Sequence, residues 1–237
     1  MSRLESYLVE GINDKGILRA IFLAGNSGSG KSYTMSKIRS GSVDARIVNT
    51  DKIFEFLGLS NVAKSKILTV GQLNLYMDSM LPLIVDGTST NSSTTLKRKA
   101  ILETVGYKTG MIFVNCSLET SLQRAKDRGE KMGRNVPPEI VRKSYESMSK
   151  VKPIYKSAFD FYLEIDNNDG ELTDEVILAA FKKAVGFFNS PLTPKGQGVV
   201  DKMIEQGWKY LSDGVYDRTF IQELASNWYD IIGGHSI

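Results

Sequence analysis

Eight residues, Gly25–Ser32, narrow the possible folds of this chain more than any others; they read GNSGSGKS. They match the pattern G-x-x-x-x-G-K-[ST], in which glycines let successive backbone N–H groups turn toward a phosphate. The apolar run Ala20–Ala24 before them predicts a buried strand, and Ser32–Arg39 after them predicts a helix whose positive end faces the same phosphate. The segment therefore predicts a phosphate-binding loop (P-loop). The alternative is a flexible turn rich in glycine and serine.

Each position of this loop has an expected part in binding ATP. The loop backbone would surround the phosphates, Lys31 would reach the β- and γ-phosphates, and the Ser32 hydroxyl would bind Mg²⁺. We therefore expect ATP and Mg²⁺ as cofactors. The residues predicted to bind the nucleotide are Gly25, Asn26, Ser27, Gly28, Ser29, Gly30, Lys31 and Ser32, together with Arg124 farther along the chain.

Apolar runs alternate with amphipathic stretches along most of the chain, as in α/β proteins whose parallel sheet is covered on both faces. We predict an α/β fold of the P-loop NTPase or kinase type, with a five-stranded parallel sheet flanked by helices. Between the strands, helical periodicity predicts helices over Thr95–Tyr107, from Leu118, from Pro138 and from Thr173 to about Phe188. The predicted strands are Leu18–Ala24, Ala45–Asn49, Leu81–Val85, Met111–Cys116 and Phe159–Ile165.

After Asn189 the composition shifts, because prolines and glycines predict a linker before a new helical stretch from Val199 onward. We predict a P-loop kinase domain over residues 1–189 and a C-terminal helical appendage over residues 190–237, packed on the kinase core.

Composition sets wider limits on compartment and chemistry. The 237 residues suit one α/β domain, and no run of apolar residues is long enough to cross a bilayer. The single cysteine, Cys116, excludes an internal disulfide and favours a cytoplasmic protein. Cys116 ends an apolar run and is predicted to be a core residue, while His235 is predicted to have no catalytic role. The net charge of +3 does not by itself indicate nucleic-acid binding.

Two carboxylates follow predicted strands, where an open parallel sheet binds its ligands. Asp51 comes after the second strand and is the candidate base that accepts a proton from a hydroxyl acceptor. The alternative is that Asp51 caps the helix after it. Asp86 would orient the acceptor or hold a metal-bound water, or else cap the turn that follows it. Neither an Asn-Lys-x-Asp guanine motif nor paired strand-end acids occur, which favours a kinase over a G-protein or motor.

Five basic residues stand from position 124 to position 134; Arg124 and Arg128 are predicted to act in catalysis, and Arg134 to bind the substrate. Arg124 and Arg128 are one helical turn apart, so both guanidinium groups can project toward the transferring phosphoryl group. Together with Arg134 they would form a lid, which Gly129 and Gly133 would allow to flex. The alternative is a solvated basic helix face.

These motifs resemble the kinase domain of phage-type polynucleotide kinases and the wider group that includes zeta-toxin-like kinases. The resemblance implies that Lys31 and Ser32 bind ATP and Mg²⁺, Asp51 is the general base, Asp86 contacts the acceptor, and Arg124 and Arg128 form the lid. The residues that carry it are Gly25–Ser32, Asn49-Thr50-Asp51, Val85–Thr88, Arg124, Arg128, Val136–Val141 and Ser144–Met148.

Two positions depart from the polynucleotide kinases. Phe54 stands where those kinases carry an arginine that helps to hold the acceptor strand, and Gly87-Thr88 follows Asp86 where they more often have Thr-Asn. The chain is also similar to phage kinases that phosphorylate 5-hydroxymethyluracil within DNA. In such a kinase Phe54 would stack on a flipped base; the alternative is that Phe54 packs in the core. The predicted substrate-binding residues are Asp51, Phe54, Asp86, Thr88 and Arg134.

The resemblance implies DNA as the acceptor, either at a 5′-hydroxyl end or at a base hydroxymethyl group, in the cytoplasm of a phage-infected host. Two alternatives stay open. One is a zeta-toxin-like kinase that phosphorylates a nucleotide-sugar. The other is an ATP-dependent assembly factor that uses its C-terminal helices as a docking surface. No membrane partner is expected, and the sequence predicts no oligomeric state.

Overall fold

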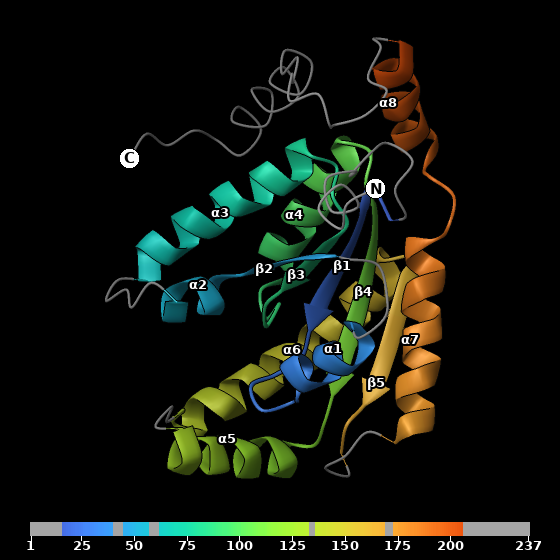
Figure 1. Ribbon diagram of the computed structural model, residues 1–237. Helices are drawn as coiled ribbons and strands as arrows, with labels where there is room; N and C mark the ends of the chain where they lie inside the picture. Colours follow the sequence, from blue (N-terminus) through green and yellow to red (C-terminus); the bar gives the residue numbers. More distant parts are fainter. Residues whose placement is uncertain (1–15, 40–44, 57–61, 133–135, 169–172, 206–237) are drawn as a thin grey trace, which may run out of the picture.

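The computed structural model describes residues 16–39, 45–56, 62–132, 136–168 and 173–205 (Figure 1). All five predicted strands are present, and their ends differ from the predicted ends by at most three residues. They form one sheet of β1 (Arg19–Ala24), β2 (Arg46–Asn49), β3 (Leu83–Asp86), β4 (Lys108–Asn115) and β5 (Phe161–Asp166).

The strand order is β2-β3-β1-β4-β5, and every neighbouring pair is parallel. The predicted α/β fold with a five-stranded parallel sheet is therefore confirmed. After β1 the chain builds one half of the sheet with β2 and β3, and then the other half with β4 and β5. The order of strands reverses at β1, so the ligand crevice of this sheet is expected at the carboxyl end of β1.

Alternate residues of β1 point to opposite faces of the sheet and join two separate cores. On one face, Ile21 and Leu23 pack with side chains of α1 (Lys31–Arg39) and α7 (Asp174–Phe188). On the other face, Ala20 and Phe22 belong to a core with side chains of four helices. These are α3 (Val62–Asp78), α4 (Ser92–Thr104), α6 (Pro138–Ala158) and α8 (Pro194–Glu205).

Two further helices begin at the carboxyl edge of the sheet: α2 (Thr50–Phe56) directly after β2, and α5 (Leu118–Met132) shortly after β4 (Figure 1). The helix α2 contacts α3, and α5 contacts α6. Within the described residues, no helix has the length and apolar character needed to cross a membrane.

Capping residues explain where several helices begin. Thr173 caps α7 as predicted, because its hydroxyl accepts a hydrogen bond from the Val176 N–H at 3.3 Å. Pro138 occupies the first position of α6, also as predicted. The helix α4 begins three residues before the predicted Thr95, because Asn91 Oδ1 accepts a hydrogen bond from the Thr94 N–H at 3.0 Å and caps the helix there.

The C-terminal prediction placed a linker where the structure has a helix. The helix α8 begins at Pro194, not Val199, since proline suits a first helical position and Thr193 Oγ1 accepts a hydrogen bond from the Gly196 N–H at 2.9 Å. Val199 and Met203 of α8 are buried in the same core as Phe22. Residues 206–237 lie outside the described residues, so the proposed boundary at residue 189 stays a prediction.

Close backbone packing of α8 generates a stability prediction. A Cβ atom at Gly196 would lie 2.6 Å from the Gly106 carbonyl oxygen, a backbone atom that cannot easily move. We expect Gly196→Ala to lower the free energy of unfolding by about 1–3 kcal/mol, measured by urea denaturation. Gly198→Ala in the same helix is the matched control: a Cβ there meets nothing within 4 Å, and the change should be neutral or stabilising by up to about 1 kcal/mol. Wild-type stability of Gly196→Ala would contradict this packing.

Candidate active site

The P-loop Gly25–Ser32 joins β1 to α1 and is closely packed against its surroundings. Gly25 has φ +153° and Gly28 has φ +84°, conformations that residues with a side chain rarely adopt. A Cβ at Gly25 would lie 2.5 Å from the Val114 carbonyl oxygen, and one at Gly28 would lie 2.6 Å from the Ser121 carbonyl oxygen. The loop can therefore keep this path only with glycine at both positions.

Hydrogen bonds from three other segments hold the loop in place. The Gly25 N–H donates to the carbonyl oxygen of Thr88, which follows β3, at 3.3 Å. The Ser27 N–H donates to the Ser144 hydroxyl of α6 at 3.2 Å, and the Asn26 amide donates to the Ser121 hydroxyl of α5. Two of these segments, α5 and the turn after β3, also bear candidate site residues.

Lys31 lies folded back on its own loop. Its Nζ donates to the carbonyl oxygens of Gly25 at 2.6 Å and Asn26 at 3.1 Å. Burial lowers the pKa of Lys31 to about 8; the carboxylates of Asp86 and Asp51 oppose this shift, and the positive charge of Arg128 adds to it. Three other predicted site residues therefore lie close enough to Lys31 for their charges to influence its pKa.

Asp86 ends β3 and lies beside Asn49, its register partner at the end of β2. Asn49 Nδ2 donates to Asp86 Oδ2 at 2.5 Å. Burial raises the pKa of Asp86, whereas the hydrogen bond from Asn49 and the charge of Lys31 lower it. Asp86 is therefore held by Asn49 at the carboxyl edge of the sheet, where its charge and that of Lys31 influence each other.

Asp51 lies exposed in the first turn of α2. The alternative prediction, that Asp51 caps this helix, is wrong. The cap is Asn49, because its Oδ1 accepts a hydrogen bond from the Lys52 N–H at 3.0 Å. The charge of Asp51 contributes to the pKa shifts of both Lys31 and Asp86. Asp51 thus stands at the positive end of α2, near the P-loop and with its carboxylate accessible.

Arg124 of α5 points at the P-loop. Its Nη2 donates to the Asn167 carbonyl oxygen at 3.0 Å, and its Nη1 lies 3.5 Å from the carbonyl oxygens of Gly28 and Ser29. Arg128, one turn later, is near enough to Lys31 to lower the pKa of that lysine. The described part of the predicted lid is a continuous helix that includes Gly129, so no flexible break occurs there.

The remaining predicted residues are placed as follows. Phe54 is half-buried on α2, Thr88 is exposed in the loop after β3, and Ser32 is exposed at the start of α1. Arg134 lies outside the described residues. Cys116 is buried, as predicted for a core residue.

Two asparagines of the site were not predicted. Asn49 links Asp86 to α2, and the buried Asn167 donates from Nδ2 to the Ser29 carbonyl oxygen at 2.9 Å while its own carbonyl oxygen accepts from Arg124. Each one ends or directly follows a strand, so the rule that pointed to Asp51 and Asp86 would also have identified them.

The donor set suits Mg²⁺, which prefers oxygen ligands and usually binds through one or two protein groups together with substrate phosphates and water. The Ser32 hydroxyl lies at the start of α1, beside the lysine predicted to reach the phosphates. In the part of the chain that the structure describes, no group of three or more His, Cys, Asp or Glu side chains could form an all-protein metal site.

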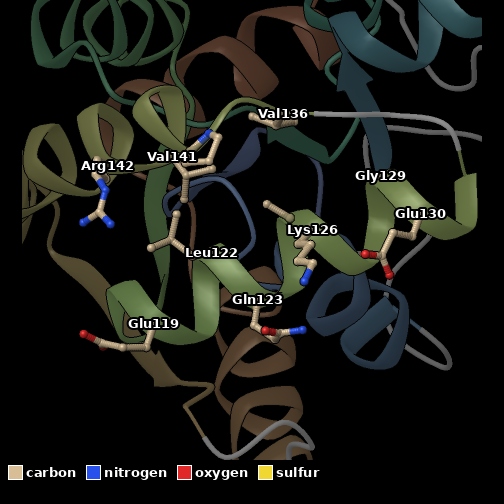
Figure 2. A pocket seen from close by; sticks show the side chains of 11 residues that line it. Glu119, Leu122, Gln123, Lys126, Gly129, Glu130, Val136, Val141 and Arg142 are labelled. Atoms are coloured by element: carbon tan, nitrogen blue, oxygen red, sulfur yellow. The ribbon is translucent and has the colours of Figure 1, made fainter.

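A groove of about 770 Å³ lies between α5 and the start of α6, and Figure 2 shows Leu122 and Val141 in it with Lys126 and Glu130 on the α5 side. At 100° per residue, the α5 residues in the groove lie on the opposite face of the helix from Arg124 and Arg128. The groove is therefore separate from the phosphate-binding crevice.

Comparison with known proteins gives a partial family match. The sequence model of the family described as Zeta toxin matches residues 63–173, which is less than half of the chain. The matched range includes Asp86, Arg124 and Arg128 but neither the P-loop nor Asp51. No curated protein matches the sequence significantly.

Two solved structures are similar in fold. One is a candidate kinase from Chloroflexus aurantiacus, with a TM-score of 0.53 and 15% identity over 71% of this chain and 97% of that one. The other is a chain of the Pnkp1/Rnl/Hen1 RNA repair complex, with a TM-score of 0.51 and 18% identity over 63% of this chain and 48% of that one. This is a P-loop kinase fold. The fold, the P-loop and the Zeta toxin match together support a phosphotransferase.

The lowered pKa of Lys31 generates a prediction about ATP binding. ATP phosphates would favour the charged lysine, so binding at pH 8.5 should take up a substantial fraction of one proton, and affinity should weaken as the pH rises above about 8. Titration calorimetry in two buffers of different ionisation enthalpy measures this uptake. Lys31→Met, which cannot titrate, should bind ATP weakly and without proton uptake. Equal affinity at pH 7 and pH 9.5 in the wild type would contradict the prediction.

Proposed function

We propose that this chain is an ATP-dependent kinase that transfers the γ-phosphoryl group of ATP to an alcohol hydroxyl. The observation that carries the proposal is that the P-loop lysine, Asp86 and Asp51 follow three neighbouring strands, β1, β3 and β2, at the carboxyl edge of the sheet. A lysine that binds phosphates beside an accessible carboxylate is the arrangement that phosphoryl transfer to a hydroxyl requires.

In the proposed reaction, the oxygen of the acceptor hydroxyl forms a bond to the γ-phosphorus, and the Asp51 carboxylate accepts the proton of that hydroxyl. The bond from that phosphorus to the β–γ bridging oxygen breaks, and ADP leaves. Lys31, Arg124 and Arg128 neutralise the charge on the transferring group and the leaving group. Mg²⁺, held by the Ser32 hydroxyl and the phosphates, would supply further charge neutralisation when bound.

Asp86 has a different part in this proposal. It is less exposed than Asp51, and the hydrogen bond that it accepts from Asn49 lowers its pKa and so makes it a weaker base. Its carboxylate faces Lys31 electrostatically and can accept a hydrogen bond from the acceptor. We assign Asp86 to acceptor orientation, with Phe54 and Thr88 on the same side of the crevice.

For the acceptor, we propose a small molecule of the nucleotide-sugar class. The Zeta toxin match supports it, since that family resemblance implies a nucleotide-sugar kinase. The distribution of charge also supports it. Arg124 and Arg128 lie on the P-loop side of α5, whereas Lys126 lines the groove on the opposite face. Lys126 therefore lies apart from Arg124 and Arg128 and does not join them in one track for a nucleic-acid backbone.

A nucleic-acid acceptor is the second candidate. It is favoured by the resemblance of Asn49-Thr50-Asp51 and Arg124-x-x-x-Arg128 to polynucleotide kinases, and by the fold similarity to a chain of an RNA repair complex. A DNA 5′ end or a base hydroxymethyl group would then lie between Asp51 and the γ-phosphate.

The proposed base is tested by Asp51→Asn, which keeps the shape of the side chain but cannot accept a proton. We expect kcat to fall by about 10²-fold or more, with ATP affinity retained. Steady-state kinetics and ATP titration measure the two quantities separately. Glu55→Gln, which removes a carboxylate from the same helix, is the matched control and should keep near-normal turnover. Wild-type kcat in Asp51→Asn would remove Asp51 from the mechanism.

The acceptor is tested by incubating the wild-type protein with γ-labelled ATP and a panel of acceptors. The panel holds nucleotide-sugars, linear 5′-hydroxyl DNA and RNA, and closed circular DNA with thymine or 5-hydroxymethyluracil. We expect label on a nucleotide-sugar, with little dependence on salt because few phosphate contacts are made.

Each other outcome overturns the nucleotide-sugar assignment in its own way. Label on linear strands alone indicates an end kinase, and label on hydroxymethylated circles indicates a base kinase. ATP hydrolysis with no labelled acceptor in the panel indicates an assembly factor.

A further inference from the structure

We propose that Asn49 is a positioning residue that holds Asp86 and the Asp51-bearing helix in one fixed arrangement, so that the two carboxylates address the same acceptor hydroxyl. This inference rests on the proposed kinase function for what the arrangement accomplishes, but its structural basis is independent of the acceptor. The Asn49 amide makes two hydrogen bonds: its nitrogen donates to Asp86 at the end of β3, and its oxygen accepts from the Lys52 N–H of α2.

The position of Asn49 follows from the sheet. It is the last residue of β2 and the register partner of Asp86, the last residue of β3. Side chains of paired residues on neighbouring strands lie on the same face of the sheet and within reach of each other. The amide nitrogen of Asn49 accordingly donates to Asp86 Oδ2 at 2.5 Å.

The other end of the amide reaches forward along the chain. Asn49 Oδ1 accepts a hydrogen bond from the Lys52 N–H at 3.0 Å and so caps α2, whose first turn contains Asp51. One planar amide therefore joins the end of β3 to the start of α2. A shift of α2 relative to Asp86 would break one of the two hydrogen bonds.

The orientation of this amide is determined by its neighbours. An amide flip would turn the carbonyl oxygen toward the Asp86 carboxylate and the NH₂ group toward the Lys52 N–H, so both contacts would become repulsive. Only asparagine supplies both an acceptor for the helix and a donor for the carboxylate at this length. Serine supplies the acceptor but is too short to reach the carboxylate, and alanine supplies neither.

The hydrogen bond also acts on the charge of Asp86. The charged groups that face this carboxylate are Lys31 of α1 and Lys52 and Asp51 of α2. Burial raises the pKa of Asp86, and the donated hydrogen bond opposes that rise more than either lysine does. Within the described residues, Oδ1 of Asp86 has no hydrogen bond, which leaves one carboxylate oxygen to accept from a bound hydroxyl.

The test uses Asn49→Ser, which keeps a good helix cap but removes the donor to Asp86, compared with Asn49→Ala. If Asn49 only capped α2, serine would restore near-normal activity. We expect instead that Asn49→Ser lowers kcat about tenfold or more, leaves the KM for ATP nearly unchanged, and shifts the acidic limb of the pH–rate profile to higher pH. Asn91→Ser is the matched control, since Asn91 caps α4 in the same way without touching a carboxylate.

A second measurement does not depend on turnover. Carbon-13 NMR titration of selectively labelled aspartate carboxyls should show a higher pKa for Asp86 in Asn49→Ser than in the wild type, with Asp86→Asn used to assign the signal. Wild-type kcat and pH profile in Asn49→Ser, or an unchanged pKa of Asp86, would overturn the proposal. If the wild type labels no acceptor, the kinase function fails, and the NMR titration still decides whether Asn49 governs Asp86.

Discussion

The P-loop passes between the end of β4 and the helix α5 at a distance that leaves no room for a Cβ atom. At Gly25 and Gly28 the nearest backbone oxygens, of Val114 and Ser121, would be 2.5 and 2.6 Å from such an atom. This close approach gives the loop its path and puts its backbone within reach of Arg124. The arrangement of lysine, arginine and carboxylates in the crevice therefore depends on backbone packing as much as on the charged residues themselves.

In the candidate site, burial and the attraction between opposite charges have opposing effects on Lys31 and Asp86. Burial works against the charge of both Lys31 and Asp86, and each partly compensates the other. Lys31 meanwhile donates to two carbonyl oxygens of its own loop. Phosphates of ATP would replace these weak partners with strong ones. The free site thus keeps its lysine on the P-loop, and among the residues that the structure describes no ion pair to Lys31 is present that ATP would have to break.

Sequence periodicity and turn residues were sufficient to predict the five strands, the parallel sheet and the P-loop, because each is a local pattern. They did not predict the start of α8, since Pro194 reads equally well as a linker residue or as the first residue of a helix. Nor did they separate Lys126 from Arg124, although helical arithmetic alone places the two on different faces of α5.

The contribution of Asn49 was not predictable from sequence for a different reason. Its two hydrogen bonds depend on the register between β2 and β3, and that pairing joins residues 37 positions apart. The sequence allowed two interpretations of Asp51, as a base or as a helix cap, and in the structure the cap of α2 is Asn49. A strand-end position was informative for all of these residues, but only strand pairing shows which of them touch.

The reversal of strand order at β1 divides the site into two halves with different tasks. Residues that hold the P-loop and face the phosphates, Arg124 and Asn167, come from the segments after β4 and β5. The residues proposed to meet the acceptor, Asp51, Phe54 and Asp86, come from the segments after β2 and β3. The P-loop lies between these two groups of residues, because β1 stands between β3 and β4 in the sheet. Under the proposed function, the side chains after β2 and β3 would select the acceptor, and those after β4 and β5 would serve phosphate binding. Such residues, and not the fold that this chain shares with the two solved structures, would decide which acceptor is used.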